Sequence, residues 1–370
     1  MNRVSFIIPV VNNFEYTKHI YENLKEYYPD DEIVISDGGS TDDTIEYFTQ
    51  LVDSNLKFIS NGKLNLCENY NRGVEHSTTD IVILLHNDMF VPPNFKERVI
   101  SKLDSNTIMS YARIEPPVFP GEEPGKVVRD FGYDLSTLNK PAIIEFSENY
   151  NSVYPGGGYL FIACHKSNWI KMDEKIFNPP QMWAADDDLH LRFRLSNFTL
   201  LISDAIVYHF VSKTSRASDS YKQVELNSNR NFIRKWGQRN LQSIVKYNIA
   251  YVVKNCTPNL LPVFEPFCDR LYVDDHYGTM ITNYIETEQP NTIYDLKTRV
   301  LNTSLNDPFN ENDIVVEFDA NDVTNNNIYI LQQLPEILYE QGEPGKFTIE
   351  VFNLDVTDLI EYQNDLIQLT

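Results

Sequence analysis

The N-terminal part of the chain repeats one pattern, and this pattern restricts the fold more than any other feature. Short runs of mostly apolar, often β-branched residues alternate with stretches whose apolar residues have helical spacing. Four such runs occupy residues 4–10, 32–36, 56–60 and 81–85. Strands that are buried on both faces of a parallel sheet have this composition. The alternation therefore predicts an α/β fold with a mostly parallel sheet flanked by helices.

The intervening stretches support this prediction. Ile20, Leu24 and Tyr27 share one helical face, as do Ile45, Phe48 and Val52. A third helix is expected around residues 66–75. Beyond it the pattern weakens, and prolines and glycines between residues 104 and 158 predict a loop-rich insert. Further elements are expected as strands at 159–164 and 200–209 and a polar helix at 218–236.

The remainder of the chain predicts a second, smaller domain. With 370 residues, the chain is long enough for two domains. Residues 313–318 and 346–352 read as strands, with a helix at 327–341 between them. We therefore expect a larger α/β N-terminal domain at 1–245 and a small α/β domain of unknown role at 246–370.

Composition excludes several classes of function. The net charge of −22 argues against nucleic-acid binding, which requires basic surface, and no Lys/Arg cluster favours anionic lipid. The four cysteines form no CxxC pair, which indicates reduced thiols. No apolar run is long enough for a transmembrane segment, and the first run is too short for a signal peptide. We expect a soluble, cytoplasmic protein.

Two carboxylates stand where the predicted sheet presents ligands. Asp37 follows the second strand and Asp88 follows the fourth. Ligands of parallel sheets bind beyond the carboxyl ends of the strands, where neighbouring strand ends converge. A hard cation on a diphosphate requires only one or two protein carboxylates. The alternative is that both residues are ordinary turn or cap residues, which Asp commonly provides.

A second group of candidates lies later in the chain. Asp186, Asp187 and Asp188 precede a helical pattern, and one of three adjacent carboxylates can have a raised pKa suited to a general base. Acidic residues also stabilise a helix N-terminus, which is the alternative explanation. Trp183 is either a sugar-stacking residue or a core aromatic residue. His209 ends a predicted strand and is either structural or a metal ligand.

Several segments together resemble the ordered motifs of family 2 glycosyltransferases. They are FIIPVVN at 6–12, ISDGGSTD at 35–42, NRG at 71–73, LLHND at 84–88, DDDLHLR at 186–192, VYH at 207–209 and NFIRKWG at 231–237. The resemblance covers residues 3–240 or so. It rests on the order and spacing of the motifs, since none of them is specific by itself.

The resemblance implies a GT-A fold and transfer of a sugar, with inversion, from a UDP-, GDP- or dTDP-sugar to a glycan or other hydroxyl acceptor. It implies that Asp37 contacts the base, and that Asp88 binds Mn²⁺ or Mg²⁺ with His209 as a second ligand. Asp186 or Asp187 would be the catalytic base. The remaining assignments are Pro9, Val11, Asp37, Arg72, Asn87 and Asp88 for the nucleotide, and Trp183, Gly157 and Gly158 for the acceptor.

The chain departs from the family pattern at two positions. His86 stands where the family usually has Asp or Asn, which predicts a metal site with a single carboxylate, and Ala185 replaces a Glu beside Asp186. Both departures favour an alternative, a non-catalytic nucleotide-sugar-binding or scaffolding module. A nucleotidyltransferase is a third alternative, but residues 11–14, VNNF, lack the glycine-rich basic loop of that class.

Overall fold

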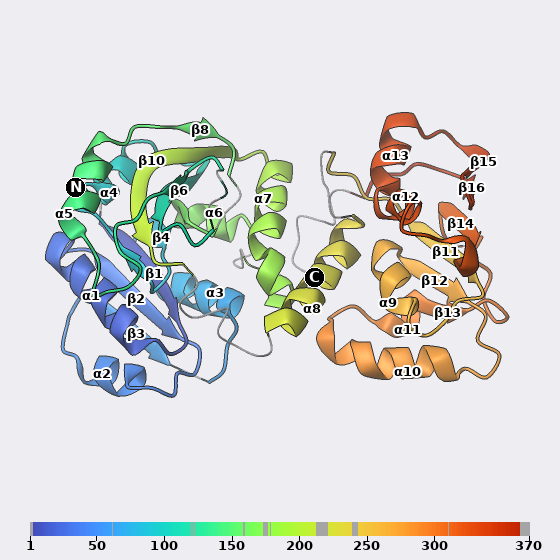
Figure 1. The fold of residues 1–370 in the computed structure, drawn as a ribbon, viewed down its shortest axis with the longest axis horizontal. Helices are drawn as coiled ribbons and strands as arrows, with labels where there is room; N and C mark the ends of the chain where they lie inside the picture. Colours follow the sequence, from blue (N-terminus) through green and yellow to red (C-terminus); the bar gives the residue numbers. More distant parts are fainter. Residues whose placement is uncertain are drawn as a thin grey trace. The chain divides into compact units, whose positions relative to one another are not determined.

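The computed structural model describes residues 3–60, 62–119, 121, 123–157, 160–172, 177, 179–211, 221–238, 243–309 and 311–362 (Figure 1). The chain divides into two compact units, Met1–Lys222 and Gln223–Gln368. The expected boundary at residue 245 lies within the second unit, which also contains the motif at 231–237. Among the described residues, none of the helices is both long and apolar enough to cross a membrane.

A ten-stranded, mostly parallel sheet forms the first unit, which confirms the predicted α/β class. Its strand order is β3-β2-β1-β4-β9-β6-β10-β5, with β7 beside β6 and β8 beside β10. The strands are β1 (Val4–Val10), β2 (Glu32–Asp37), β3 (Leu56–Ser60), β4 (Ile81–Leu84), β5 (Met89–Phe90), β6 (Thr107–Glu115), β7 (Lys126–Val128), β8 (Tyr154–Pro155), β9 (Ile162–His165) and β10 (Thr199–His209). The helices are α1 (Phe14–Tyr27), α2 (Thr44–Gln50), α3 (Leu66–His76), α4 (Phe95–Ile100), α5 (Lys140–Asn149), α6 (Lys166–Ile170), the 3-10 helix η1 (Pro179–Ala184) and α7 (Ala185–Leu195).

The apolar runs become the central strands, as expected. All residues of β1, β2 and β4 are buried. Helix α1 packs on one face of the sheet through Ile20 and Leu24, which are fully buried. Glycine permits the close approach of helix α3, because a Cβ at Gly73 would lie 2.5 Å from a methyl of Ile7. Each fully buried aliphatic side chain contributes about 1.5–3 kcal/mol.

Strand β6 is the main element that the sequence pattern did not reveal. The predicted loop-rich insert at 104–158 includes this strand, yet all nine residues of the strand are buried. Four of them, Thr107, Ser110, Arg113 and Glu115, are polar, and Ser110 and Arg113 interrupt the apolar run. A pattern based on apolar runs therefore misses this strand, although its polar side chains lie in the functional edge of the sheet.

A second, six-stranded sheet forms the core of the second unit, with strand order β13-β12-β11-β14-β16-β15. The strands are β11 (Ile249–Lys254), β12 (Arg270–Val273), β13 (Val300–Asn302), β14 (Ile314–Asp319), β15 (Gly345–Ile349) and β16 (Phe352–Val356). The helices are α8 (Tyr221–Trp236), α9 (Leu261–Phe264), α10 (Thr279–Glu288), α11 (Leu296–Arg299), α12 (Ile328–Gln332) and α13 (Leu334–Gln341), with 3-10 turns η3 (Glu265–Phe267), η4 (Gln289–Asn291) and η5 (Ala320–Asp322).

The predicted elements of the tail are present but differently divided. The helix expected at 327–341 is two helices, since Pro335 lies in the first turn of α13 and lacks the N–H that would continue α12. The strand expected at 346–352 is a hairpin of β15 and β16, which are antiparallel. Glu350 adopts a positive φ of 53° in its turn. The first three strands, β11 to β13, were not predicted.

Candidate functional site

The sheet of the first unit brings several strand ends to one edge. Strands β1, β2 and β4 are parallel to one another. Strand β9 is antiparallel to both β4 and β6, and β10 is parallel to β6. Strands β6 and β10 therefore run in the same direction as β1. The residues at their carboxyl ends, Glu115 and His209, lie at the same edge as Asp37 and Asp88.

His86, Asp88 and His209 form a compact cluster at this edge. Their potential ligand atoms all lie within 4.8 Å of one another, and this is the group in the described part of the chain suited to a metal ion. His209 Nε2 is 3.4 Å from Asp88 Oδ1 and 3.4 Å from His86 Nδ1. The sequence predicted Asp88 and His209 as ligands. The position of His86 beside them was not predicted.

Glu115 holds His209 from the side opposite Asp88. His209 Nδ1 lies 2.9 Å from Glu115 Oε1, so this carboxylate directs Nε2 toward the cluster. Arg113 Nε donates to the same Oε1 at 2.9 Å, and Lys126 lies 3.6 Å from Oε2. Sequence reasoning missed Glu115, although it ends a strand just as Asp88 follows one. A carboxylate that orients a ligand histidine is a common feature of metal sites.

The two histidines have opposite electrostatic environments. Burial lowers the pKa of His86 to about 4, and the charge of His209 acts in the same direction. Burial also lowers the pKa of His209, but Asp88 and Glu115 outweigh this effect and raise the pKa to about 9. Burial disfavours the ionised form of Glu115, yet its hydrogen bond and charge interaction with His209 lower its pKa to about 2. The two carboxylates thus favour the protonated form of His209, whereas burial favours the neutral form of His86.

The geometry of the cluster fits a divalent ion. Ligand atoms about 2.1 Å from an ion lie about 3.0–3.4 Å from each other in octahedral or tetrahedral coordination. The separations of His209 Nε2 from Asp88 Oδ1 and from His86 Nδ1, both 3.4 Å, match this range. Moreover, Nε2 of His86 is buried without a hydrogen-bond partner among the described residues. Two imidazole nitrogens and one carboxylate oxygen are a complete protein contribution to such a site.

Asp37 is buried and holds the loop that follows β2. Its carboxylate accepts hydrogen bonds from the N–H groups of Gly39 and Ser40, both at 3.1 Å, and from the Ser60 hydroxyl at 2.7 Å. Gly38 is required in this loop, because a Cβ there would lie 2.3 Å from Asn69 Nδ2. The expected contact of Asp37 with a nucleotide base remains a prediction.

Arg72 connects β2, β3 and α3 next to this loop. Its guanidinium donates to Ser36 Oγ at 3.0 Å, Asn69 Oδ1 at 3.0 Å, Ile59 O at 3.3 Å and the carbonyl of Asp37. Burial lowers the pKa of Arg72. These contacts tie the ends of β2 and β3 to α3, so Arg72 supports the loop that is predicted to hold the nucleotide.

The loop after β1 is tied to the loop after β2. Asn12 and Asn13 have positive φ angles of 61° and 67°. The Asn12 N–H donates to Ser40 Oγ at 2.6 Å, and Asn12 Oδ1 accepts from the Thr41 N–H at 2.6 Å. Pro9 is buried in β1, whereas Val11 is 37% exposed at its open end.

Asn87 is held by the first helix. Its Nδ2 donates to Thr17 Oγ1 at 3.1 Å, and the side chain is buried. Like the assignments of Pro9, Val11 and Arg72, its assignment to the nucleotide stays a prediction.

The acidic run opens helix α7, and its three carboxylates differ. Asp188 is fully buried and paired with Arg192, one turn later, at 2.8 Å. Asp186 is half-buried and Asp187 is exposed. Burial, together with the charge of Asp187, raises the pKa of Asp186 to about 7. Asp188 is therefore structural, and Asp186 has the properties expected of a general base.

The residues predicted to contact the acceptor lie around α7. Trp183 is half-buried in η1, directly before α7. Gly157 packs against α7, since a Cβ there would lie 2.6 Å from Cε1 of His190 and 3.1 Å from Ser110 Oγ. Gly158 lies outside the described residues. The three acceptor assignments remain predictions.

Comparison with known proteins finds a family model that matches part of the chain. Residues 5–136 match the model of "Glycosyl transferase family 2". Similar solved structures include Staphylococcus aureus TarS 1-349 and the mannosyltransferase PcManGT from Pyrobaculum calidifontis, the latter in complex with GDP-Man and Mn²⁺. Each is 15% identical over 63% of this chain, with TM-scores of 0.43 and 0.42.

The aligned regions cover 63% and 64% of those two chains, which is less than two thirds of their length. No curated protein matches the chain. The family match ends at residue 136, so the resemblance of the later motifs remains a prediction. Residues 5–136 of this chain are therefore similar to glycosyl transferase family 2.

Proposed function

We propose that the protein is a metal-dependent, inverting glycosyltransferase that moves a sugar from a nucleoside-diphosphate sugar to an acceptor hydroxyl. The cluster of His86, Asp88 and His209 carries this proposal. It lies at the carboxyl edge of a parallel sheet, in which ligands of such folds bind. Two of its residues, His86 and Asp88, also lie within the segment that matches the model of glycosyl transferase family 2.

The donor side of the site is built from loops that are rigidly held. Asp37, Arg72 and Asn12 connect the loops after β1 and β2 and leave Val11 exposed between them. We assign the nucleoside to these loops and the diphosphate to the region of Asp88. A divalent ion held by His86, Asp88 and His209 would neutralise the charge that develops on the leaving diphosphate.

Asp186 is the proposed general base. A pKa of about 7 lets this carboxylate be ionised in a useful fraction of molecules near neutral pH and still accept a proton readily. The acceptor oxygen forms a bond with the anomeric carbon on the face opposite the diphosphate, and the bond from that carbon to the phosphate oxygen breaks. The acceptor proton passes to Asp186, and one displacement inverts the configuration.

The ligand atoms of the cluster also influence the choice of metal ion. Mg²⁺ prefers oxygen ligands and retains water, whereas imidazole nitrogens favour first-row transition ions. Two histidines with one aspartate therefore favour Mn²⁺ over Mg²⁺, the two ions that the family resemblance implies. His86, which stands in place of the usual carboxylate, is the residue responsible for this preference.

The test is a screen of UDP-, GDP- and dTDP-sugars by thermal shift with Mn²⁺, followed by turnover assays with the stabilising donor. A ligand at one hundred times its Kd raises stability by about 2.7 kcal/mol. Asp88→Ala should abolish turnover. Asp30→Ala, an exposed aspartate outside the site, is the matched control. Full turnover in Asp88→Ala refutes the proposal, and donor binding without turnover in the wild type supports the non-catalytic alternative.

A further inference from the structure

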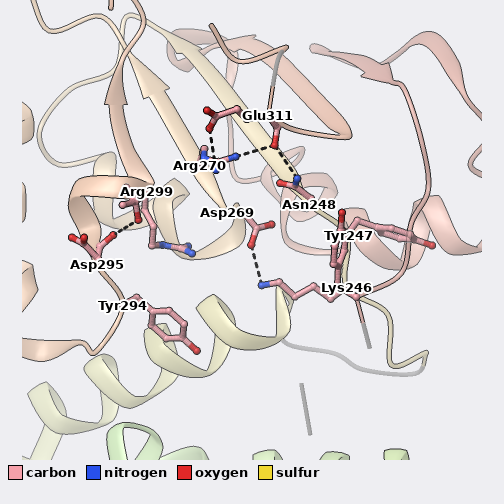
Figure 2. Close-up of a pocket in the computed structure, with 11 residues that line it drawn as sticks. Lys246, Tyr247, Asn248, Asp269, Arg270, Tyr294, Asp295, Arg299 and Glu311 are labelled. Atoms are coloured by element: carbon pink, nitrogen blue, oxygen red, sulfur yellow. Dashed lines mark hydrogen bonds and ion pairs between the residues drawn. The ribbon is translucent and has the colours of Figure 1, made fainter. Parts of the chain in front are cut away.

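The second unit contains a cavity that the proposed transfer reaction does not use. Its volume is about 440 Å³, within the roughly 300–1,000 Å³ of small-molecule sites. Figure 2 shows its lining side chains, all of which belong to the second unit. The lining residues are Lys246, Tyr247, Asn248, Asp269, Arg270, Tyr294, Asp295, Thr298, Arg299, Glu311 and Tyr362.

The lining is polar but balanced in charge. Lys246 pairs with Asp269 at 3.3 Å, and Arg270 pairs with Glu311 at 3.1 Å. Arg299 contacts Glu265 at 2.6 Å, a carboxylate that it shares with Arg234. With Asp295 included, three basic and three acidic residues line the cavity, so the lining carries no net charge that would select an anionic or cationic ligand. The lining instead offers carboxylates and carbonyls as acceptors and guanidinium, ammonium and amide groups as donors, a combination that suits hydroxyl groups.

Tyrosine rings supply the apolar part of the lining. Tyr247, Tyr294 and Tyr362 all border the cavity. The ring of Tyr294 is half-buried and lies against the Arg299 guanidinium, 5.7 Å from its centroid. Tyr362 is fixed by its hydroxyl, which donates to Asp313 at 2.9 Å, and by its N–H, which donates to Lys246 O at 2.9 Å. Fixed aromatic rings beside hydrogen-bonding groups match the apolar faces and hydroxyl edges of a sugar ring.

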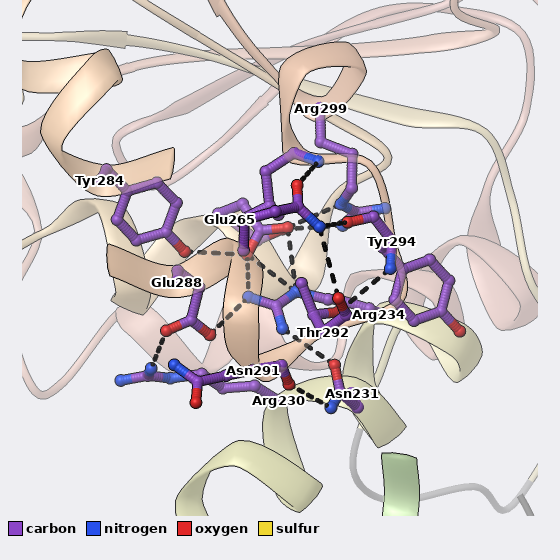
Figure 3. Close-up of polar contacts among 12 residues, drawn as sticks. Arg230, Asn231, Arg234, Glu265, Tyr284, Glu288, Asn291, Thr292, Tyr294 and Arg299 are labelled. Atoms are coloured by element: carbon purple, nitrogen blue, oxygen red, sulfur yellow. Dashed lines mark hydrogen bonds and ion pairs between the residues drawn. The ribbon is translucent and has the colours of Figure 1, made fainter. Parts of the chain in front are cut away.

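A buried ionic network makes one wall of the cavity rigid. Figure 3 shows Glu265 between Arg234 and Arg299, with Tyr284 and Glu288 beside them. Arg234 donates to Glu265 at 2.7 Å and to Glu288 at 2.8 Å, and both Arg234 and Glu265 are fully buried. Burial opposes the charge on Glu265, yet the two arginines lower its pKa to about 2. Arg299 is therefore held in place before any ligand arrives, which reduces the entropy lost on binding.

We infer that this cavity binds an uncharged oligosaccharide, and that it serves as a site for the acceptor glycan in addition to the transfer site of the first unit. The class of ligand follows from the balanced charges, the fixed tyrosines and the size of the cavity. The acceptor role rests on the proposed function, whereas sugar binding by the cavity does not. The second unit thereby acquires a role, which the sequence did not indicate.

The test is binding of the full-length chain to an array of uncharged oligosaccharides, in EDTA and without nucleotide, followed by saturation-transfer NMR with the sugars that bind. Tyr294→Ala removes one ring, and Thr298→Trp fills the cavity from an exposed helical position. Thr287→Trp is the matched control, since Thr287 is likewise exposed and its hydroxyl likewise bonds to a backbone carbonyl in a helix. We expect at least a tenfold loss of affinity in the first two variants and none in the control.

Donor hydrolysis, with water as acceptor, separates this inference from the proposed function. Tyr294→Ala and Thr298→Trp should hydrolyse the donor as the wild type does, while Asp88→Ala should lose hydrolysis and retain sugar binding. Absence of oligosaccharide binding by the wild type overturns the inference. Equal binding by Thr298→Trp and the wild type, or binding of charged glycans alone, overturns it as well. If the wild type binds sugars but does not hydrolyse the donor, the sugar site of the second unit stands and the proposed transferase function is refuted.

Discussion

Replacing Asp186 and Asp187 separately by Asn distinguishes the two candidate bases. The pKa of Asp186 rises from 3.8 to about 7, because burial and the charge of Asp187 both oppose its ionisation. If Asp186 is the base, Asp186→Asn should lower kcat by about 10²–10⁴ and retain donor binding. Asp187→Asn should remain active, and the acid limb of its pH–rate profile should move to lower pH.

The same shift predicts an effect on stability. Between about pH 4 and 7, folded Asp186 retains a proton that the unfolded chain has lost, so stability falls as pH rises through this window. A rise of about three pKa units costs up to about 4 kcal/mol once the carboxylate is ionised. Asp186→Asn removes this cost. Its free energy of unfolding should therefore exceed that of the wild type above pH 7, and the difference should shrink toward pH 4.

Urea denaturation at pH 5 and pH 8, together with kcat/KM between pH 5 and 9, measures both effects. Two results would refute the reasoning. One is full activity in Asp186→Asn with loss in Asp187→Asn, which would assign the base to Asp187. The other is a stability difference between Asp186→Asn and the wild type that is the same at both pH values, because the pKa of Asp186 would then be unperturbed by folding.

Three further predictions concern the metal cluster and the second unit. His86→Asp should reduce the ratio of Mn²⁺ to Mg²⁺ affinity at least tenfold in calorimetric titrations, and an unchanged ratio would exclude His86 as a ligand. Glu115→Gln should weaken Mn²⁺ binding about 10–100-fold, because His209 loses the carboxylate that orients it; unaltered affinity would contradict that role. Glu265→Gln should destabilise the second unit by about 3–5 kcal/mol in urea denaturation, since the buried Arg299 loses its carboxylate partner and Arg234 loses one of two. The exposed Glu340→Gln should have little effect, and equal stability of the two variants would argue against a stabilising network.

Parts of the site were predictable because local rules apply to them. Asp88 follows a buried apolar strand and His209 ends another, so the sequence pattern places both residues at the carboxyl ends of strands. Glu115 obeys the same rule, but Arg113 and Ser110 interrupt the apolar run of its strand and conceal it. His86 is a departure from the family motif, and only its distance to His209 reveals it as a potential ligand.

The sequence by itself determined the α/β class, the central strands of the first sheet and the carboxylates at their ends. These follow from periodicity and burial, which depend on neighbours along the chain. Tertiary structure alone decided that β9 is inserted antiparallel between β4 and β6, so that β6 and β10 return in the direction that brings Glu115 and His209 to the edge of Asp88. It also decided the cavity of the second unit. Its walls come from residues before or at the starts of β11, β12 and β14, from helix α11 and the residues before it, and from Tyr362, and their convergence depends on contacts between residues remote in sequence.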